Sequence, residues 1–209
     1  MQKITFIIVL AFSFFSLTAC NIIQHKNITG SNYQCLRWRE HKNQVQKIVK
    51  YQTSGSLAYF SNHQRLYARF FWQQSAPDYY YIVISNPMFS NAISLYSIRG
   101  IIWLTDHKGK SYFSKSADEI IQKLTGIRIP LQILRLWILG LPGNAVYVKL
   151  NNQDKLQNIT EIKDGVTWKV KYLKYNSDTY PEMPTQLDII QDDKLVKLKI
   201  DTWVLKNDF

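Results

Sequence analysis

Hydrophobic and polar residues alternate over most of the chain after position 53, with the period of two that is typical of half-buried β-strands. The clearest case is the segment 166–172, where Val166, Trp168, Val170 and Tyr172 fall on one face. The alternation predicts strands over 56–60, 65–73, 79–85, 92–98, 101–105, 111–114, 146–150, 156–162, 166–172, 187–190 and 195–204. About ten or eleven short strands joined by tight turns indicate an antiparallel meander rather than alternating strands and helices.

A helical period appears before the first strand. Residues 34–51 carry apolar side chains at Trp38, Val45, Ile48 and Val49, with charged residues between them. This spacing predicts an amphipathic helix.

A pair of helices is predicted in the middle of the strand series. Ser116 and Glu119 have the spacing of a capping box, so the first helix begins at Ser116 and ends at Gly126. Pro130 opens the second helix and Gly140 closes it. This second helix is apolar on nearly all sides and must be covered by other apolar surface. We therefore expect the pair to pack across the concave face of a curved antiparallel sheet, as a helical lid on a half-barrel around an apolar space.

The N-terminus has the pattern of a secretory signal peptide. Lys3 precedes an apolar run over residues 4–15, which is too short to span a bilayer and is followed at once by polar residues. The run ends in Leu17-Thr18-Ala19-Cys20, the small-residue pattern that a lipoprotein signal peptidase needs before a cysteine that receives a diacylglyceryl group. An ordinary signal peptide with an accidental cysteine is the weaker interpretation, because Cys20 follows the apolar run so closely.

The chain therefore divides into three parts. Residues 1–19 are expected to be a lipoprotein signal peptide, 20–32 a lipidated tether, and 33–209 the folded domain. Asn21 follows the lipidated residue, whereas in enterobacterial-type lipoproteins an aspartate there favours retention in the inner membrane. Resemblance to that sorting rule implies export to the outer membrane.

Charge and cysteine content narrow the classes of partner. The chain has 26 Lys and Arg against 15 Asp and Glu, a formal net charge of +11. Such an excess is compatible with nucleic acid, anionic lipid or an acidic protein. The basic residues are scattered and no nucleic-acid-binding signature is present, so an acidic protein partner or a membrane surface is the better interpretation. With Cys20 lipidated, Cys35 is alone and we expect no intramolecular disulfide.

Candidate chemistry is sparse. The four histidines are scattered without metal-ligand spacing, and no nucleophile elbow occurs. Gly109-Lys110-Ser111 looks like the tail of a phosphate loop, but Leu104 occupies the position of the leading glycine. We therefore expect neither catalysis nor a metal or other cofactor. The apolar sheet face and helix could form a filled core or a pocket for a lipid chain, and the residue pattern leaves both open.

Several stretches resemble the LolB family of outer-membrane lipoprotein receptors. The most specific is Trp-Ile-Leu-Gly-Leu-Pro-Gly at 137–143. The others lie at 51–59, 67–74, 86–87, 124–131, 168–172, 183–184 and 197–203, so the resemblance covers essentially the whole mature domain.

The resemblance implies an unclosed antiparallel β-barrel capped by helices, with an apolar cavity that accepts lipoproteins from the periplasmic carrier LolA and passes them to the outer membrane. The implied partners are LolA, the acyl chains of client lipoproteins and the outer membrane, where the protein is lipid-anchored on the periplasmic face and expected to be monomeric. Phe70, Trp72, Leu134 and Trp137 are expected to line or frame the cavity, with plain core as the alternative. The rival function is an envelope scaffold without lipid binding.

The family also has a loop that presses a leucine toward the membrane in an Asn-Pro-Leu-Gly context. This chain has Asn86-Pro87-Met88-Phe89, so Met88 stands at the leucine position and Phe89 replaces the glycine. Because glycine tolerates dihedral angles that phenylalanine does not, the backbone of this loop can differ from the family's. Met88 and Phe89 are expected to form the membrane-insertion loop, and the alternative is a strand connection that packs into the core.

Overall fold

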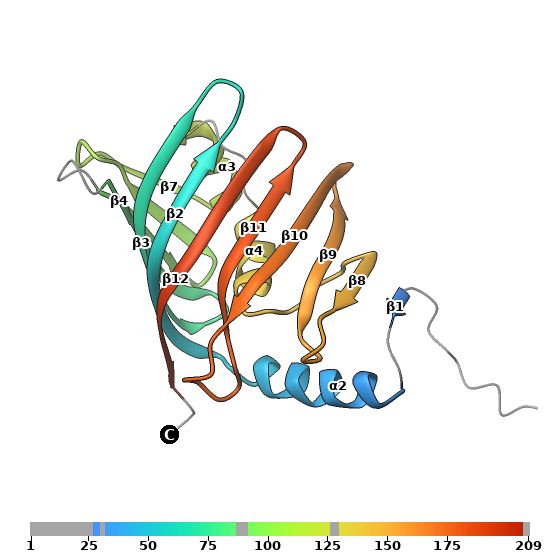
Figure 1. Ribbon diagram of the computed structural model, residues 1–209. Coiled ribbons are helices and arrows are strands. Elements are labelled where there is room, and N and C mark those ends of the chain that lie inside the picture. The colour runs from blue at the N-terminus through green and yellow to red at the C-terminus, as the bar shows by residue number, and fades with distance from the viewer. Residues whose placement is uncertain (1–26, 30–31, 87–91, 126–129, 207–209) are drawn as a thin grey trace, which may run out of the picture.

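One curved sheet of twelve strands dominates the structure, a computed structural model that describes residues 27–29, 32–86, 92–125 and 130–206 (Figure 1). Its strands, in the order in which they neighbour one another, are β1 (Asn27–Thr29), β8 (Tyr147–Leu150), β9 (Leu156–Lys163), β10 (Val166–Tyr175), β11 (Pro184–Gln191), β12 (Lys194–Lys206), β2 (Lys50–Phe60), β3 (Arg65–Ala76), β4 (Tyr79–Ser85), β5 (Ala92–Ile98), β6 (Ile101–Thr105) and β7 (Ser111–Ser114).

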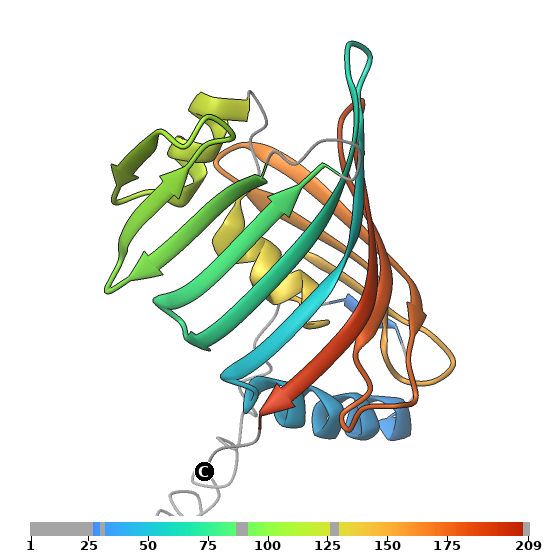
Figure 2. The same ribbon diagram turned by 90° about the vertical axis from the view of Figure 1, so that its left-hand side faces the viewer.

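The sheet forms a barrel that does not close. Neighbouring strands from β8 to β7 are all antiparallel, and β1 adds a parallel pairing to β8 at one edge. In the described part of the chain, β1 and β7 are the two ends of the strand order and do not pair with each other. Figure 2 shows the sheet wrapping round on itself. The predicted mainly β fold, an unclosed antiparallel barrel, is confirmed.

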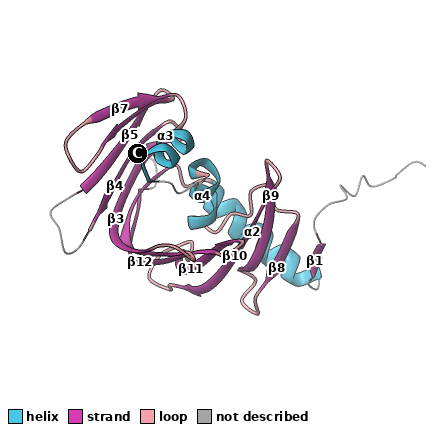
Figure 3. Ribbon diagram, turned by 90° about the horizontal axis from the view of Figure 1, so that it is seen from above, coloured by secondary structure: helices cyan, strands magenta, loops and turns pink. Residues whose placement is uncertain are grey.

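Three helices complete the described part of the fold. Helix α2 (Asn32–Gln46) runs across one end of the curved sheet (Figure 1). Helices α3 (Ala117–Thr125) and α4 (Leu131–Ile138) follow β7, and α4 lies inside the curve of the sheet (Figure 3). The Ser116 hydroxyl accepts a hydrogen bond from the Glu119 backbone N–H at 3.3 Å, which confirms the predicted cap. Of the helical pair predicted as a lid, α4 lies over the concave face, and α3 packs beside the edge strand β7 (Figure 3).

Two predicted boundaries are wrong. The helix expected over 34–51 ends at Gln46, and the strand expected from residue 56 begins at Lys50. Tyr51 and Thr53 are buried on the concave face and extend the alternation of β2 backwards, with Tyr51 paired to Gln74 of β3. Cross-strand pairing therefore overrides the helical spacing of the preceding segment.

Other strands are longer than their alternation predicts. The strand predicted over 187–190 spans Pro184–Gln191, and the strand predicted over 195–204 spans Lys194–Lys206. In addition, Asn27–Thr29, within the segment predicted as a tether, pairs with Tyr147–Lys149 as β1. In each case hydrogen bonds to a partner strand continue beyond the residues that alternate between apolar and polar.

Candidate functional site

Apolar side chains in register cover the concave face of the sheet. Trp72 of β3 pairs with Ile82 of β4, Ile82 with Leu95 of β5, and Leu95 with Leu104 of β6. All four are buried, and together they form one row across four strands. Since successive residues of a strand point to opposite faces, this row places every second residue of these strands inside the barrel.

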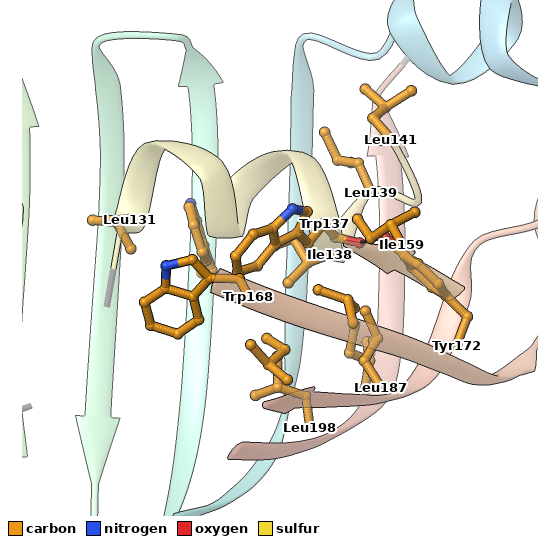
Figure 4. Close-up of a cluster of buried hydrophobic side chains, with 14 of the residues drawn as sticks. Leu131, Trp137, Ile138, Leu139, Leu141, Ile159, Trp168, Tyr172, Leu187 and Leu198 are labelled. Atoms are coloured by element: carbon orange, nitrogen blue, oxygen red, sulfur yellow. Dashed lines mark hydrogen bonds between the residues drawn. The ribbon is translucent and has the colours of Figure 1, made fainter. Parts of the chain in front are cut away.

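Helix α4 covers this face with Trp137 at its centre. The side chain of Trp137 is fully buried and its ring centroid lies 5.8 Å from that of Trp168 on β10 (Figure 4). Its indole N–H donates to Oε2 of the buried Glu161 at 3.3 Å, and its carbonyl accepts from the Tyr172 hydroxyl at 3.1 Å. Burial raises the pKa of Tyr172 well above its usual range and the nearby Glu161 carboxylate raises it further, so this hydroxyl stays protonated and donates.

The end of α4 has a fixed backbone geometry. Leu141 N–H donates to the Leu136 carbonyl and Gly140 N–H to the Trp137 carbonyl, both at 2.9 Å, which is the pair of bonds of a Schellman motif. Gly140 has a φ of 77°, where a side chain is strained. A Cβ there would also lie 3.1 Å from Cγ of Pro184. These requirements explain the glycine that closes the helix in the string at 137–143.

All four predicted cavity residues belong to the apolar core that α4 and the concave face of the sheet share. Trp72 and Trp137 belong to the buried core, and Phe70 and Leu134 are half-buried and pack against it. In this conformation α4 lies over the concave face (Figure 3), and these four side chains contact other core residues. Their contact with an acyl chain stays a prediction.

A second row of apolar residues is only half-buried, and sequence reasoning missed most of it. Phe70 of β3 pairs with Ile84 of β4, and Ile84 pairs with Ile93 of β5. The three side chains point to the same face as the Trp72 row but are more exposed. Ile84 and Ile93 are next in sequence to Ser85 and Ala92, the last residue pair that joins β4 and β5 before residues 87–91. Register with Phe70 was the signal that could have identified Ile84 and Ile93.

Trp72 also carries a buried polar atom. Among the described residues, its indole Nε1 has no hydrogen-bond partner, although the side chain is 4% exposed. A buried donor without an acceptor costs about 1–3 kcal/mol. The concave face therefore holds a hydrogen-bond donor without an acceptor.

The remaining predicted site residues lie outside the described part of the chain. Cys20, the predicted lipid attachment site, and Met88 and Phe89, the predicted membrane-insertion loop, are not among the described residues.

A polar cleft of about 400 Å³ lies between α2 and the loops beneath the sheet. Arg37 Nε contacts Oδ2 of Asp154 at 2.9 Å, and Lys155 is ion-paired with Glu182. Burial lowers the pKa of His41, and the Lys155 ammonium lowers it further against the opposing effect of Glu182. The Arg37–Asp154 pair attaches α2 to the end of the sheet, and the Lys155–Glu182 pair joins two of the loops beside it.

Within the described ranges, no group of three or more His, Cys, Asp and Glu side chains is arranged to hold a metal ion. None of the helices in these ranges is long and apolar enough to cross a bilayer.

Known proteins resemble the chain in sequence and in fold. The family model described as "Outer membrane lipoprotein LolB" matches residues 49–203. Proteins named outer-membrane lipoprotein LolB from Yersinia pseudotuberculosis and Yersinia pestis are each 40% identical over 206 residues, covering 99% of both chains.

Two solved structures share the fold at low sequence identity. A LolA superfamily protein from Nitrosomonas europaea aligns with a TM-score of 0.53 at 10% identity, over 81% of this chain and 93% of its own. A putative outer membrane lipoprotein-sorting protein domain from Vibrio parahaemolyticus aligns with a TM-score of 0.56 at 8% identity, over 85% of this chain and 92% of its own.

Proposed function

The chain belongs to the LolB family of outer-membrane lipoproteins, and from this premise we propose that it accepts lipoproteins from the periplasmic carrier LolA and inserts them into the outer membrane. The acyl chains of the client enter between α4 and the concave face of the sheet. The observation that carries this proposal is the half-buried row Phe70, Ile84 and Ile93 beside the fully buried row under α4.

The physical need for such a site is large. Exposing one methylene to water costs about 0.8 kcal/mol, so a chain of about fifteen carbons costs roughly 12 kcal/mol. A lipoprotein must therefore pass from one sheltered apolar site to another without crossing water. The apolar concave face is a surface of the required chemistry, and the transfer step consumes no cofactor.

Helix α4 must move to admit acyl chains, since Trp137 and Leu131 are buried against the sheet. Buried polar contacts oppose this movement, because the Trp137 indole N–H donates to Glu161 and the Trp137 carbonyl accepts from the Tyr172 hydroxyl. Two further polar contacts hold the start and middle of the helix. The Leu131 N–H donates to Oδ1 of Asp118 at 2.8 Å, and Arg135 Nη1 donates to the Pro77 carbonyl at 3.0 Å. The other contacts are largely apolar, and acyl chains can replace them at little free-energy cost because apolar contact is not directional.

The unpaired indole N–H of Trp72 supports the same proposal. A lipid-modified cysteine carries ester and amide carbonyls next to its acyl chains. Once α4 has moved, one of these carbonyls can accept from Trp72 Nε1 and remove the cost of the unsatisfied donor.

The lipid anchor of the protein is placed at Cys20. Intact-mass measurement of the mature protein should show a chain that starts at Cys20 and carries a diacylglyceryl group and an additional acyl chain. An unmodified Cys20 in the mature protein would contradict this assignment.

Delivery to the membrane is assigned to the loop that carries Met88 and Phe89. An exposed apolar side chain can partition into the bilayer interface, whereas a carboxylate resists leaving water. Met88→Glu should therefore accept lipoprotein from LolA at the normal rate but deliver it poorly to liposomes. Phe89→Glu should act in the same direction if Phe89 shares the loop tip, and should destabilise the fold if Phe89 is buried.

Both variants are made in a form that begins after Cys20, so that the anchor does not hold the protein on the membrane. The matched control is Leu173→Glu, which changes an exposed apolar residue on β10 to the same charge. Thermal melts come first, followed by separate assays of transfer from LolA and delivery to liposomes. Normal delivery by a folded Met88→Glu protein would refute the role of the loop.

The rival function is an envelope scaffold, which is favoured by the observation that Trp137 of α4 is fully buried against the concave face. Incubating the anchor-free domain with LolA carrying an acylated lipoprotein separates the two. A stable complex with the client supports the acceptor function. A client that stays on LolA, with the domain folded, supports the scaffold.

A further inference from the structure

Four aromatic side chains lie side by side on the convex face of β4–β7. Tyr81 pairs with Tyr96, Tyr96 with Trp103, and Trp103 with Phe113, so the row crosses four adjacent strands in register. The rings of Tyr81 and Tyr96 are stacked with their centroids 4.1 Å apart. Tyr96 is 45% exposed, Trp103 39% and Phe113 80%. We call these four residues the aromatic row.

The apolar surface continues beyond the aromatic row. Ile98 and Ile101 pair across the turn between β5 and β6 and are both exposed, as is Tyr79 at the start of β4. Figure 2 views this side of the sheet, and none of the described helices covers it, because α4 lies behind the strands on the concave side. A contiguous patch of this kind, in contrast to scattered single residues, marks an interaction surface.

Basic residues flank the aromatic row at both ends of the strands. Lys108 and Lys110 lie in the turn that joins β6 to β7, and Arg99 and Lys115 lie at the other end of these strands, all exposed. Asp106 in the same turn already accepts hydrogen bonds from the backbone N–H groups of residues 108 and 110 and from a tyrosine hydroxyl. The surface around the row therefore favours an anionic partner.

We propose that the convex face of β4–β7 lies against the headgroup region of a bilayer that contains anionic lipid. Tyrosine and tryptophan prefer the membrane interface, where the ring is apolar and the N–H or O–H is hydrated. Lysine and arginine beside them bind lipid phosphates, each with a favourable contribution near an anionic surface. This contact is separate from the loop at 87–91 and goes beyond the acceptor function.

The position of the chain on the membrane favours lipid over another occupant. The protein is a lipid-anchored outer-membrane protein. The proposed anchor, Cys20, precedes Asn27 of β1 by seven residues, so the start of the fold lies at most about 25 Å from the bilayer. The strands β4–β7 lie at the other end of the strand order from β1, but the anchor still keeps the whole fold at a high effective concentration near the bilayer. Contacts too weak to bind lipid from free solution are therefore sufficient.

The test uses the full lipidated protein in vesicles of phosphatidylethanolamine and phosphatidylglycerol, without any client. A polarity-sensitive fluorophore is attached to a cysteine that replaces Phe113, in a background where Cys35→Ser removes the other thiol. The matched control places the cysteine at Tyr67, which is 58% exposed on the convex face of β3. We expect a blue shift and quenching by bromine-labelled lipid at position 113, and neither at position 67.

Equal, water-like spectra at positions 113 and 67 would overturn the proposal. A shift at 113 that grows with the protein-to-lipid ratio and ignores bromine-labelled lipid would assign the face to a second copy of the chain, which also overturns it. If the Phe113 variant does not fold, Tyr96→Cys tests the same row. Because no client or LolA is present, the result is independent of the acceptor function.

Discussion

At the residue scale, the buried pair of Trp137 and Glu161 helps to attach α4 to the sheet, together with the Tyr172 hydroxyl that donates to the Trp137 carbonyl. Glu161 is 3% exposed and accepts a hydrogen bond from the indole of Trp137. The Gly143 backbone lies close by, and a Cβ at Gly143 would be 3.1 Å from Oε2 of Glu161. A buried carboxyl group is tolerated only with such partners, since an unsatisfied one is costly. This pair therefore helps to fix where α4 lies along the sheet.

Substitution of Trp137 tests this attachment. Trp137→Ala removes a fully buried indole, and we expect a loss of about 3–5 kcal/mol in the free energy of unfolding. Trp137→Phe keeps most of the apolar volume but removes the N–H that Glu161 accepts, for a loss of about 1–3 kcal/mol. Urea denaturation measures both. In a double-mutant cycle with Glu161→Gln, additive losses would show that the two side chains are not coupled.

Substitution of Trp72 should affect client binding more than stability, in contrast to substitution of Trp137. Trp72→Phe removes a buried donor that has no acceptor among the described residues, so the free energy of unfolding should change by less than about 1 kcal/mol. The complex with an acylated lipoprotein should dissociate faster, because the carbonyl of the client loses its donor. Dissociation is followed by displacement with unlabelled lipoprotein, with Trp103→Phe on the convex face as the control. An unchanged dissociation rate would leave Trp72 as plain core.

At the scale of elements, local pattern predicted the strands better than it predicted their limits. The strands at 79–85, 92–98, 101–105 and 111–114 are confirmed to the residue, because short hairpins end where their turn residues begin. The start of β2 was wrong because its first half is defined by pairing with β3 and β12, which only the assembled sheet supplies. Ile84 and Ile93 were missed for the same reason, because only the pairing of β3, β4 and β5 brings them beside Phe70.

Helix α2 should detach more easily at acid pH. The pKa of His41 is lowered in the folded protein by burial and by Lys155, so below pH 6.5 the unfolded chain binds a proton that the folded protein does not. The free energy of unfolding therefore falls as pH decreases from 6.5 toward the lowered pKa of His41. Urea denaturation at several pH values gives the free energy of unfolding as a function of pH. This free energy should fall less steeply with decreasing pH in His41→Gln than in the unsubstituted protein. His63→Gln, at an exposed turn residue, is the control for the loss of an imidazole elsewhere in the chain.

At the scale of the whole molecule, part of the basic excess lies on the convex face of β10–β12. Lys171 of β10 and Lys197 of β12 flank Asp188 of β11 in one cross-strand row, and Lys169 and Lys199 lie on the same face. This half of the sheet is basic, whereas the half formed by β4–β7 carries the aromatic row. The molecule therefore presents two chemically different surfaces outside and one apolar surface inside.

The net charge predicts the kinetics of the handover from LolA. If the carrier presents an acidic rim, opposite charges accelerate the encounter and salt screens them. The association rate should fall on the order of tenfold between about 50 mM and about 500 mM salt, since the Debye length is about 10 Å at 0.1 M. Stopped-flow mixing of LolA with the anchor-free domain measures this rate. An association rate that does not change with salt would show that the positive charge reflects amino-acid composition and has no role in the encounter with LolA.

The missing bond between β1 and β7 has a mechanical consequence. In a closed barrel the hydrogen-bonded strands form a complete ring, which fixes the diameter. The interior can widen only if the hydrogen bonds between two strands break. This barrel is open instead. Its two edge strands can move apart by a small change of twist in every strand, while all eleven strand pairings persist. The interior of the barrel can therefore widen for acyl chains of different size. The sheet returns to its resting curvature once the client has left.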